Sequence, residues 1–200
     1  MKQRIVLDLT DLTPNAMGSA SLTWWGTLAF MLIEGTGFVL MIAVYLYLAS
    51  LAPVWPPGVP PPDPGPGLWM TLILLVSVVP NALVSRWAGR QDLRRVRIGL
   101  VIMTLLGAAS LLPRIYEFGA MQVLWDRNAY GSVVWMLLGL HTTHILTDLI
   151  DTIVLCALMF TRHGANPRRF GDVQDNALYW HFVVLTWLPI LACLYGVPRL

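Results

Sequence analysis

The sequence predicts an all-α membrane protein, a polytopic helical bundle of five transmembrane helices that forms a single membrane domain over residues 1–200. Hydrophobic residues make up 56% of the chain and charged residues only 12%. In a typical soluble domain, about a quarter of the residues are charged. The apolar residues fall in long continuous runs, and the mean hydropathy is +0.65. A spanning helix needs about 20 mostly apolar residues, and five runs are that long.

The spans are separated by polar or proline-rich connections. The first predicted span, residues 22–51, is long enough to tilt or to project beyond the bilayer. Residues 52–67 follow, and so much proline excludes a helix and predicts a stiff extended periplasmic loop. The remaining spans are expected at residues 68–88, 97–116, 132–161 and 177–197.

The distribution of basic residues predicts the orientation, because cytoplasmic loops carry an excess of Lys and Arg. Residues 1–20 hold no continuous apolar core, so we expect a retained cytoplasmic segment rather than a cleaved signal. With ten basic residues on one side of the spans and three on the other, the N-terminus is expected in the cytoplasm and the C-terminus in the periplasm. The ten are Lys2, Arg4, Arg86, Arg90, Arg94, Arg95, Arg97, Arg162, Arg168 and Arg169, and the three are Arg114, Arg127 and Arg199. Topology explains these arginines, so no nucleic-acid partner is expected.

Glu34 is a lone carboxylate deep in the first predicted span, with apolar sequence continuing to Leu51. An ionisable group at that depth costs about 2.5 kcal/mol or more if it faces lipid. We therefore expect Glu34 to face protein or water.

The other ionisable groups within the membrane concentrate in the fourth span. His141, His144, Asp148 and Asp151 are spaced by three, four and three residues, so all four share one helical face. His181 stands near the start of the fifth span. Such a polar stripe must face a neighbouring helix, a polar ligand or water.

Three interpretations of this stripe remain open from the residues alone. It could hold helices together through hydrogen bonds, with Glu34 paired to a histidine. It could handle protons, because buried carboxylates and imidazoles form relays. It could ligate a metal, or a haem held by His144 and His181, but too few ligands come from other helices for a di-iron site. We expect no metal, cofactor or catalytic residue on this chain.

Four motifs, taken in order, resemble subunit III of the haem-copper oxygen reductases, the cytochrome c oxidase subunit 3 family. The first, at Glu34–Phe38, is a buried glutamate followed by a glycine- and phenylalanine-rich turn, and the second, at Trp55–Val59, is a loop of tryptophan, two prolines and a glycine. The third, at Gly139–His144, is a helix with a glycine and paired histidines. The fourth, at Tyr179–Trp187, is the start of the last helix.

The resemblance implies a subunit without redox centres that packs beside catalytic subunit I and other oxidase subunits of a bacterial inner (cell) membrane. Partner subunits would carry haem and copper and reduce oxygen to water with electrons from cytochrome c or quinol. The subunit would support proton uptake and the stability of the catalytic subunit, and would bind phospholipid. Glu34 would be the buried carboxylate, with His141, His144 and His181 lining the same proton or lipid-cleft site.

The sequence also departs from the family pattern. Many members have seven helices, and this chain is expected to lack the first two. Asp148 and Asp151 are not part of the pattern. Alternative functions are an accessory subunit of a nitric oxide reductase, a stand-alone small transporter with the span-four stripe as its coupling site, and a haem-anchoring subunit that uses His144 and His181.

Overall fold

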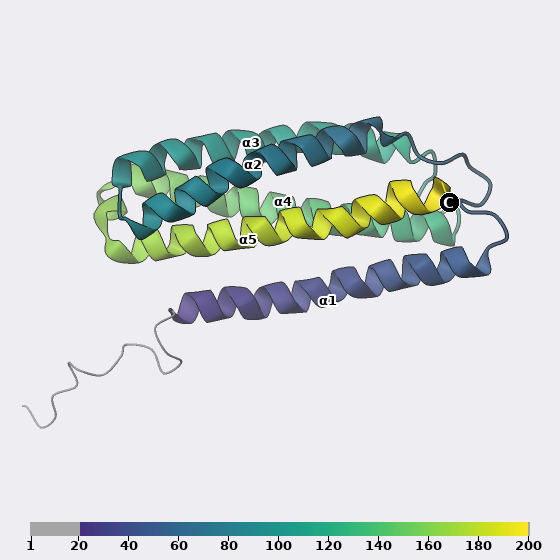
Figure 1. Cartoon of the computed structure of the whole chain (residues 1–200), viewed down its shortest axis with the longest axis horizontal. Helices are drawn as coiled ribbons and strands as arrows, with labels where there is room; N and C mark the ends of the chain where they lie inside the picture. Colours follow the sequence, from purple (N-terminus) through teal and green to yellow (C-terminus); the bar gives the residue numbers. More distant parts are fainter. Residues whose placement is uncertain (1–20, 200) are drawn as a thin grey trace, which may run out of the picture.

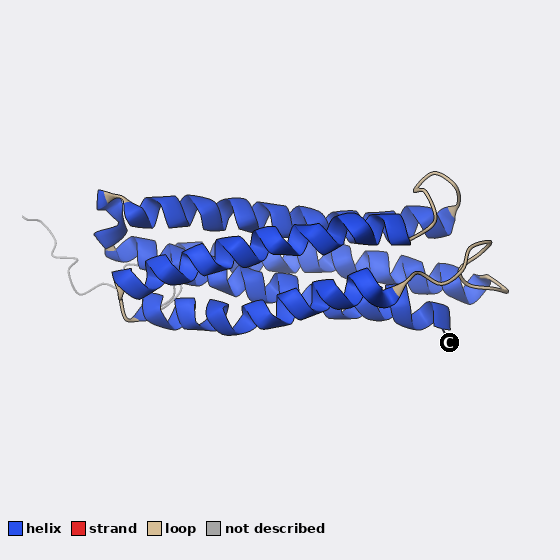
Figure 2. Cartoon of the chain, turned by 90° about the horizontal axis from the view of Figure 1, so that it is seen from above, coloured by secondary structure: helices blue, strands red, loops and turns tan. Residues whose placement is uncertain are grey.

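A computed structural model describes residues 21–199 of the chain and confirms the all-helical membrane fold. Its five long helices alternate in direction along one axis, and all five are long and apolar enough to cross a membrane (Figures 1 and 2). No strand occurs among the described residues. The helices are α1 (Leu22–Leu51), α2 (Pro64–Gly89), α3 (Leu93–Ala120), α4 (Ala129–Phe160) and α5 (Pro167–Leu191), with short turns η1 (Arg162–Ala165), η2 (Ala192–Gly196) and η3 (Val197–Arg199).

Helices α2 to α5 begin earlier than hydropathy predicts, because local capping extends them beyond the apolar runs. Asp63 accepts a hydrogen bond from the Gly65 amide at 3.0 Å, and Pro64 occupies the first helical position, where its missing N–H costs nothing. The proline-rich loop therefore ends at residue 63 and not at 67. Asn166 and Pro167 start α5 in the same way, ten residues before the predicted span.

One end of the bundle carries the connections that are rich in arginine, and we call it the arginine-rich end. The start of α1, the α2–α3 connection and the α4–α5 connection all lie there (Figure 1). The opposite end carries the loop of residues 52–63, and we call it the proline-loop end. Lys2 and Arg4, on which part of the orientation prediction rests, lie outside the described residues.

Helix α1 lies beside the other four helices rather than among them (Figure 1). It packs mainly on α4 and α5, and its fully buried side chains are Phe38 and Tyr45. The remaining helices form a group in which α2 packs on α3 and α5, and α4 packs on α3 and α5. A residue on the inward face of α1 is therefore positioned by α4 and α5.

Indole hydrogen bonds connect α2 to α5 across the buried interface. Trp180 Nε1 donates to Ser77 Oγ, and Trp187 Nε1 donates to Thr71 Oγ1, each at 2.8 Å. Helices inside a membrane gain nothing from apolar burial against each other, so close packing and such polar contacts hold them together.

We expect Ser77→Ala to lower the free energy of unfolding by about 1–3 kcal/mol, because the buried indole N–H of Trp180 loses its acceptor. Denaturant titration of the full chain in detergent micelles measures this. Thr104→Val is the control, since the Thr104 hydroxyl donates to Leu100 within its own helix. Equal losses in the two variants would contradict a specific role for the interhelical bond.

Candidate functional site

Glu34 projects from the inward face of α1 toward α4 and α5. Its Oε2 accepts a hydrogen bond from the Tyr179 hydroxyl at 2.7 Å, and its Oε1 lies 3.1 Å from His144 Nε2. The Glu34 and His144 side chains are 16% and 6% exposed. The structure thus brings Glu34 and His144 together, as the helical spacing allowed, at a junction of α1, α4 and α5.

The hydrogen bonds of His144 fix the position of one ring proton. His144 Nδ1 lies 2.5 Å from the Leu140 carbonyl oxygen, which can only accept, so Nδ1 carries a proton. Nε2 is then the nitrogen directed at Glu34, and this contact has the length but not the alignment of a hydrogen bond. The Phe38 ring packs on His144 at 4.9 Å between centroids and shields the pair on one side.

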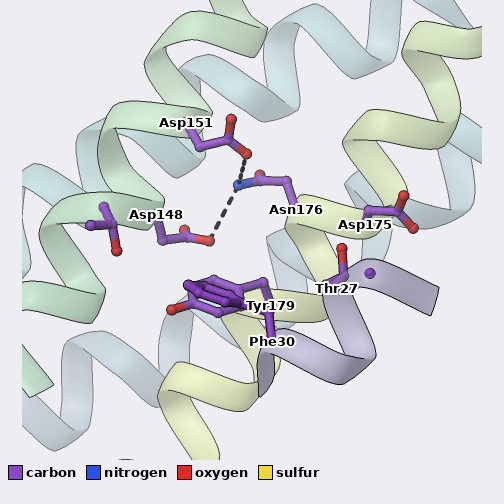
Figure 3. Close-up of a pocket in the computed structure, with 9 residues that line it drawn as sticks. Thr27, Phe30, Asp148, Asp151, Asp175, Asn176 and Tyr179 are labelled. Atoms are coloured by element: carbon purple, nitrogen blue, oxygen red, sulfur yellow. Dashed lines mark hydrogen bonds between the residues drawn. The ribbon is translucent and has the colours of Figure 1, made fainter. Parts of the chain in front are cut away.

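The two carboxylates that follow in α4 are held by one amide. Asn176 Nδ2 lies 3.2 Å from both Asp148 Oδ1 and Asp151 Oδ2 (Figure 3). Thr152 donates a hydrogen bond to the Asn176 side-chain oxygen. Asp148 is buried, whereas Asp151 is exposed at the edge of the helix.

These carboxylates line a cavity of about 380 Å³ that we call the acidic pocket. Helix α1 contributes its segment around Phe30, and Tyr179 forms part of the wall (Figure 3). The polar lining residues are Thr27, Thr147, Asp148, Asp151, Asp175, Asn176 and Tyr179.

His141 lies apart from Glu34 in a second buried cluster. Its Nδ1 is 2.7 Å from Arg114 NH2, a group that can only donate, so its Nε2 carries the proton and donates to the Val183 carbonyl at 3.0 Å. The Phe38 ring packs against both histidines, with its centroid 4.9 Å from that of His144 and 6.3 Å from that of His141.

Arg114 and Glu117 form the centre of that second cluster, and the sequence reasoning missed both. Arg114 NH1 pairs with Glu117 Oε2 at 2.6 Å, with the side chains 2% and 0% exposed. Tyr195 donates to Glu117 Oε1 at 2.7 Å, and Trp187 packs on the guanidinium at 4.6 Å. From the sequence alone, Arg114 is only one of the three basic residues expected on the periplasmic side. Its i, i+3 spacing to Glu117 was the available signal of a buried pair.

His181 also lies apart from Glu34. Asn81 Nδ2 contacts His181 Nδ1 at 2.8 Å and the Ala177 carbonyl at 2.7 Å, which places His181 at the α2–α5 interface. Of the four residues expected at one site, the structure brings together only Glu34 and His144. Within residues 21–199, no group of three or more His, Cys, Asp or Glu side chains is arranged to hold a metal ion.

Comparison with known proteins adds a family relationship. Residues 17–197 match the family model of Cytochrome c oxidase subunit III. The chain is 26% identical to cytochrome c oxidase subunit 3 of Synechocystis sp., over 89% of this chain and 77% of that protein. It is 24% identical to the Thermostichus vulcanus protein, over 87% of each chain. It is 28% identical to the Drosophila melanogaster protein, over 86% of this chain and 68% of that one.

Proposed function

From the premise that this chain belongs to the cytochrome c oxidase subunit III family, we propose that it is the non-catalytic subunit III of a bacterial respiratory haem-copper oxygen reductase. It would pack in the inner membrane beside catalytic subunit I. Haem and copper in partner subunits would supply the oxygen chemistry. The contribution of this chain would be to sustain proton uptake by the catalytic subunit and to prolong its working life.

The observation that supports this role is the placement of Glu34. A carboxyl group that meets a tyrosine hydroxyl and an imidazole inside a membrane can take up and release a proton without moving a charge into lipid. Glu34, His144 and Tyr179 come from three different helices, so the packing of these helices keeps the donors and acceptors within contact distance.

Lipid binding is part of the same proposal. An apolar groove of about 470 Å³ runs between α1 and Phe182 of α5, and its lining includes Leu32, Gly35 and Val39. A groove with this lining fits an acyl chain, and it follows the outer side of the helix that carries Glu34. Phospholipid in this groove would support the docked position of α1.

Glu34→Gln tests the proposed function. We expect the variant to copurify with the catalytic subunit in normal amount, but to take up protons more slowly and to inactivate after fewer turnovers. The glutamine keeps the size of the side chain and removes the exchangeable carboxyl proton. Oxygen consumption over time and proton uptake by the purified complex measure the two effects.

Asp126→Asn provides the control, because Asp126 is an exposed carboxylate in the α3–α4 connection, at the proline-loop end. It should behave like the unmodified chain. Normal turnover, lifetime and proton uptake in Glu34→Gln would leave Glu34 with a structural role only.

A further inference from the structure

Tyr179 belongs to the Glu34 site and to the acidic pocket at the same time. Its hydroxyl donates to Glu34 at 2.7 Å, while the side chain forms part of the pocket wall beside Asp148 (Figure 3). The Tyr179 side chain thus lines the cavity and contacts the Glu34 carboxyl group. The pocket and the buried pair are therefore neighbouring compartments with a hydroxyl group between them.

The hydrogens that the neighbouring hydrogen bonds fix leave the contact between Glu34 and His144 without an assigned donor. His144 Nδ1–H is directed at the Leu140 carbonyl, and the Tyr179 hydroxyl hydrogen is directed at Glu34 Oε2. Oε1 and Nε2 thus face each other at 3.1 Å with no donor assigned. Two lone pairs at that distance repel each other, so the contact is favourable only with one proton on the carboxyl oxygen or on the nitrogen.

On the side of His144 away from the pocket, the series of polar contacts ends. The Phe38 ring packs against both His144 and His141, and the two nitrogens of His141 contact Arg114 and the Val183 carbonyl. Along the part of the chain that the structure describes, no hydrogen bond connects His144 to that second cluster. Among the described residues, the hydrogen bond of Glu34 therefore leads to Tyr179 and the acidic pocket, and not to the second cluster.

The pocket lies toward the arginine-rich end. Asp175 stands eight residues after Pro167, the first residue of α5, or about 12 Å along the helix. The charged groups around this region are the pocket carboxylates and, one turn nearer the end, the Arg169–Asp172 pair at 2.9 Å. A cavity of this volume with carboxylate, amide and hydroxyl groups in its walls is large and polar enough to hold water.

We infer that the acidic pocket is a one-sided proton inlet, through which the Glu34–His144 pair exchanges its proton with water at the arginine-rich end by way of Tyr179. This inference rests on the proposed role of Glu34 and names its route. A proton that reaches the Tyr179 oxygen from pocket water is matched by transfer of the hydroxyl hydrogen to Glu34 Oε2. No phenolate forms, and the pair gains the one proton that the pocket water loses. Release follows the same steps in reverse.

Hydrogen–deuterium exchange followed by infrared spectroscopy of the purified complex tests the route. The bands of the pair are those lost in Glu34→Gln and in His144→Gln. We expect Tyr179→Phe and Asp148→Asn to slow exchange of these bands by roughly tenfold or more, the effect of about 1.4 kcal/mol added to the barrier. Tyr47→Phe, at an exposed position of α1, and Asp126→Asn should exchange like the unmodified complex. Unchanged exchange in Tyr179→Phe would overturn the inference.

A second measurement does not depend on removing a hydrogen bond. Thr147 lines the pocket, whereas Ile150 lies one turn nearer the arginine-rich end of α4 and is 60% exposed on the outer surface. We expect a charged thiol reagent to modify Thr147→Cys, and not Ile150→Cys, in complexes embedded in liposomes. The modified Thr147→Cys complex should also show slowed exchange. Failure of the reagent to reach Thr147→Cys would exclude a hydrated pocket.

These outcomes are separable from those of the proposed function. Exchange reports the route alone and requires no turnover. If Glu34→Gln leaves turnover and lifetime unchanged while Tyr179→Phe slows exchange, the inlet stands without the respiratory role. If Glu34→Gln shortens the lifetime while Tyr179→Phe and Asp148→Asn leave the exchange rate unchanged, the proposed role stands and this route is wrong.

Discussion

Arg114→Met is expected to lower the free energy of unfolding of the chain by about 3–5 kcal/mol, because it leaves the Glu117 carboxylate buried without its cation. Glu117 is fully buried, and the Tyr195 hydroxyl alone cannot replace the guanidinium. The substitution also removes the donor to His141 Nδ1 and the stacking on Trp187. Denaturant titration in detergent micelles provides the measurement.

Arg95→Met is the matched control for this prediction. Arg95 also pairs with a carboxylate three residues away, but the Arg95 and Asp92 side chains are 60% and 37% exposed. A pair so exposed to solvent contributes at most about 1 kcal/mol. The double variant Arg114→Met/Glu117→Leu should lose less than Arg114→Met alone, because no unpaired charge remains. A double variant whose loss equals the sum of the single losses would show that the two residues do not interact.

Gly67→Ala is expected to lower the free energy of unfolding by about 1–3 kcal/mol through overpacking. A methyl group on Gly67 would lie 2.9 Å from the Tyr195 hydroxyl oxygen and closer still to the ring carbons. The ring cannot turn away at low cost, because it is 7% exposed and its hydroxyl is bound to Glu117. The same titration measures the loss.

Gly139→Ala controls for the change of glycine to alanine in a helix. No atom lies within 4 Å of the methyl group that it would add, so the variant should gain up to about 1 kcal/mol from helix propensity. The Gly67→Ala loss should also shrink in a Tyr195→Ala background. If the loss is the same with and without the Tyr195 ring, the close approach is not its cause.

The fold was predictable from the sequence because hydropathy alone decides which segments leave water for lipid. The helix ends were less predictable. Residues 167–176 are too polar to score as a span, yet Asn166 and Pro167 start the helix there. Hydropathy locates the part of a helix inside the hydrocarbon core, whereas capping residues determine where the helix begins.

The candidate site was only partly predictable. The spacing of His141 and His144 placed both on one face of α4, but the rotation of α4 against α1 decides which of them meets Glu34, and no pattern within one helix contains that rotation. His141 instead accepts a hydrogen bond from Arg114. Arg114 lies at the end of an apolar run, where a role in membrane orientation is an equally good explanation of a basic residue. Asn176, which joins Asp148 to Asp151, lies before the predicted fifth span.

The separation in sequence between Glu34 and its partner has a consequence for biogenesis. Tyr179 is synthesised 145 residues after Glu34, and His144 also comes late, in the fourth of the five helices. During that interval a nascent α1 alone in the bilayer would expose a carboxyl group to lipid, at a cost of about 2.5 kcal/mol or more. Closure of α1 onto α4 and α5 is thus favoured only after α5 has been synthesised, so this contact forms last among the contacts of α1.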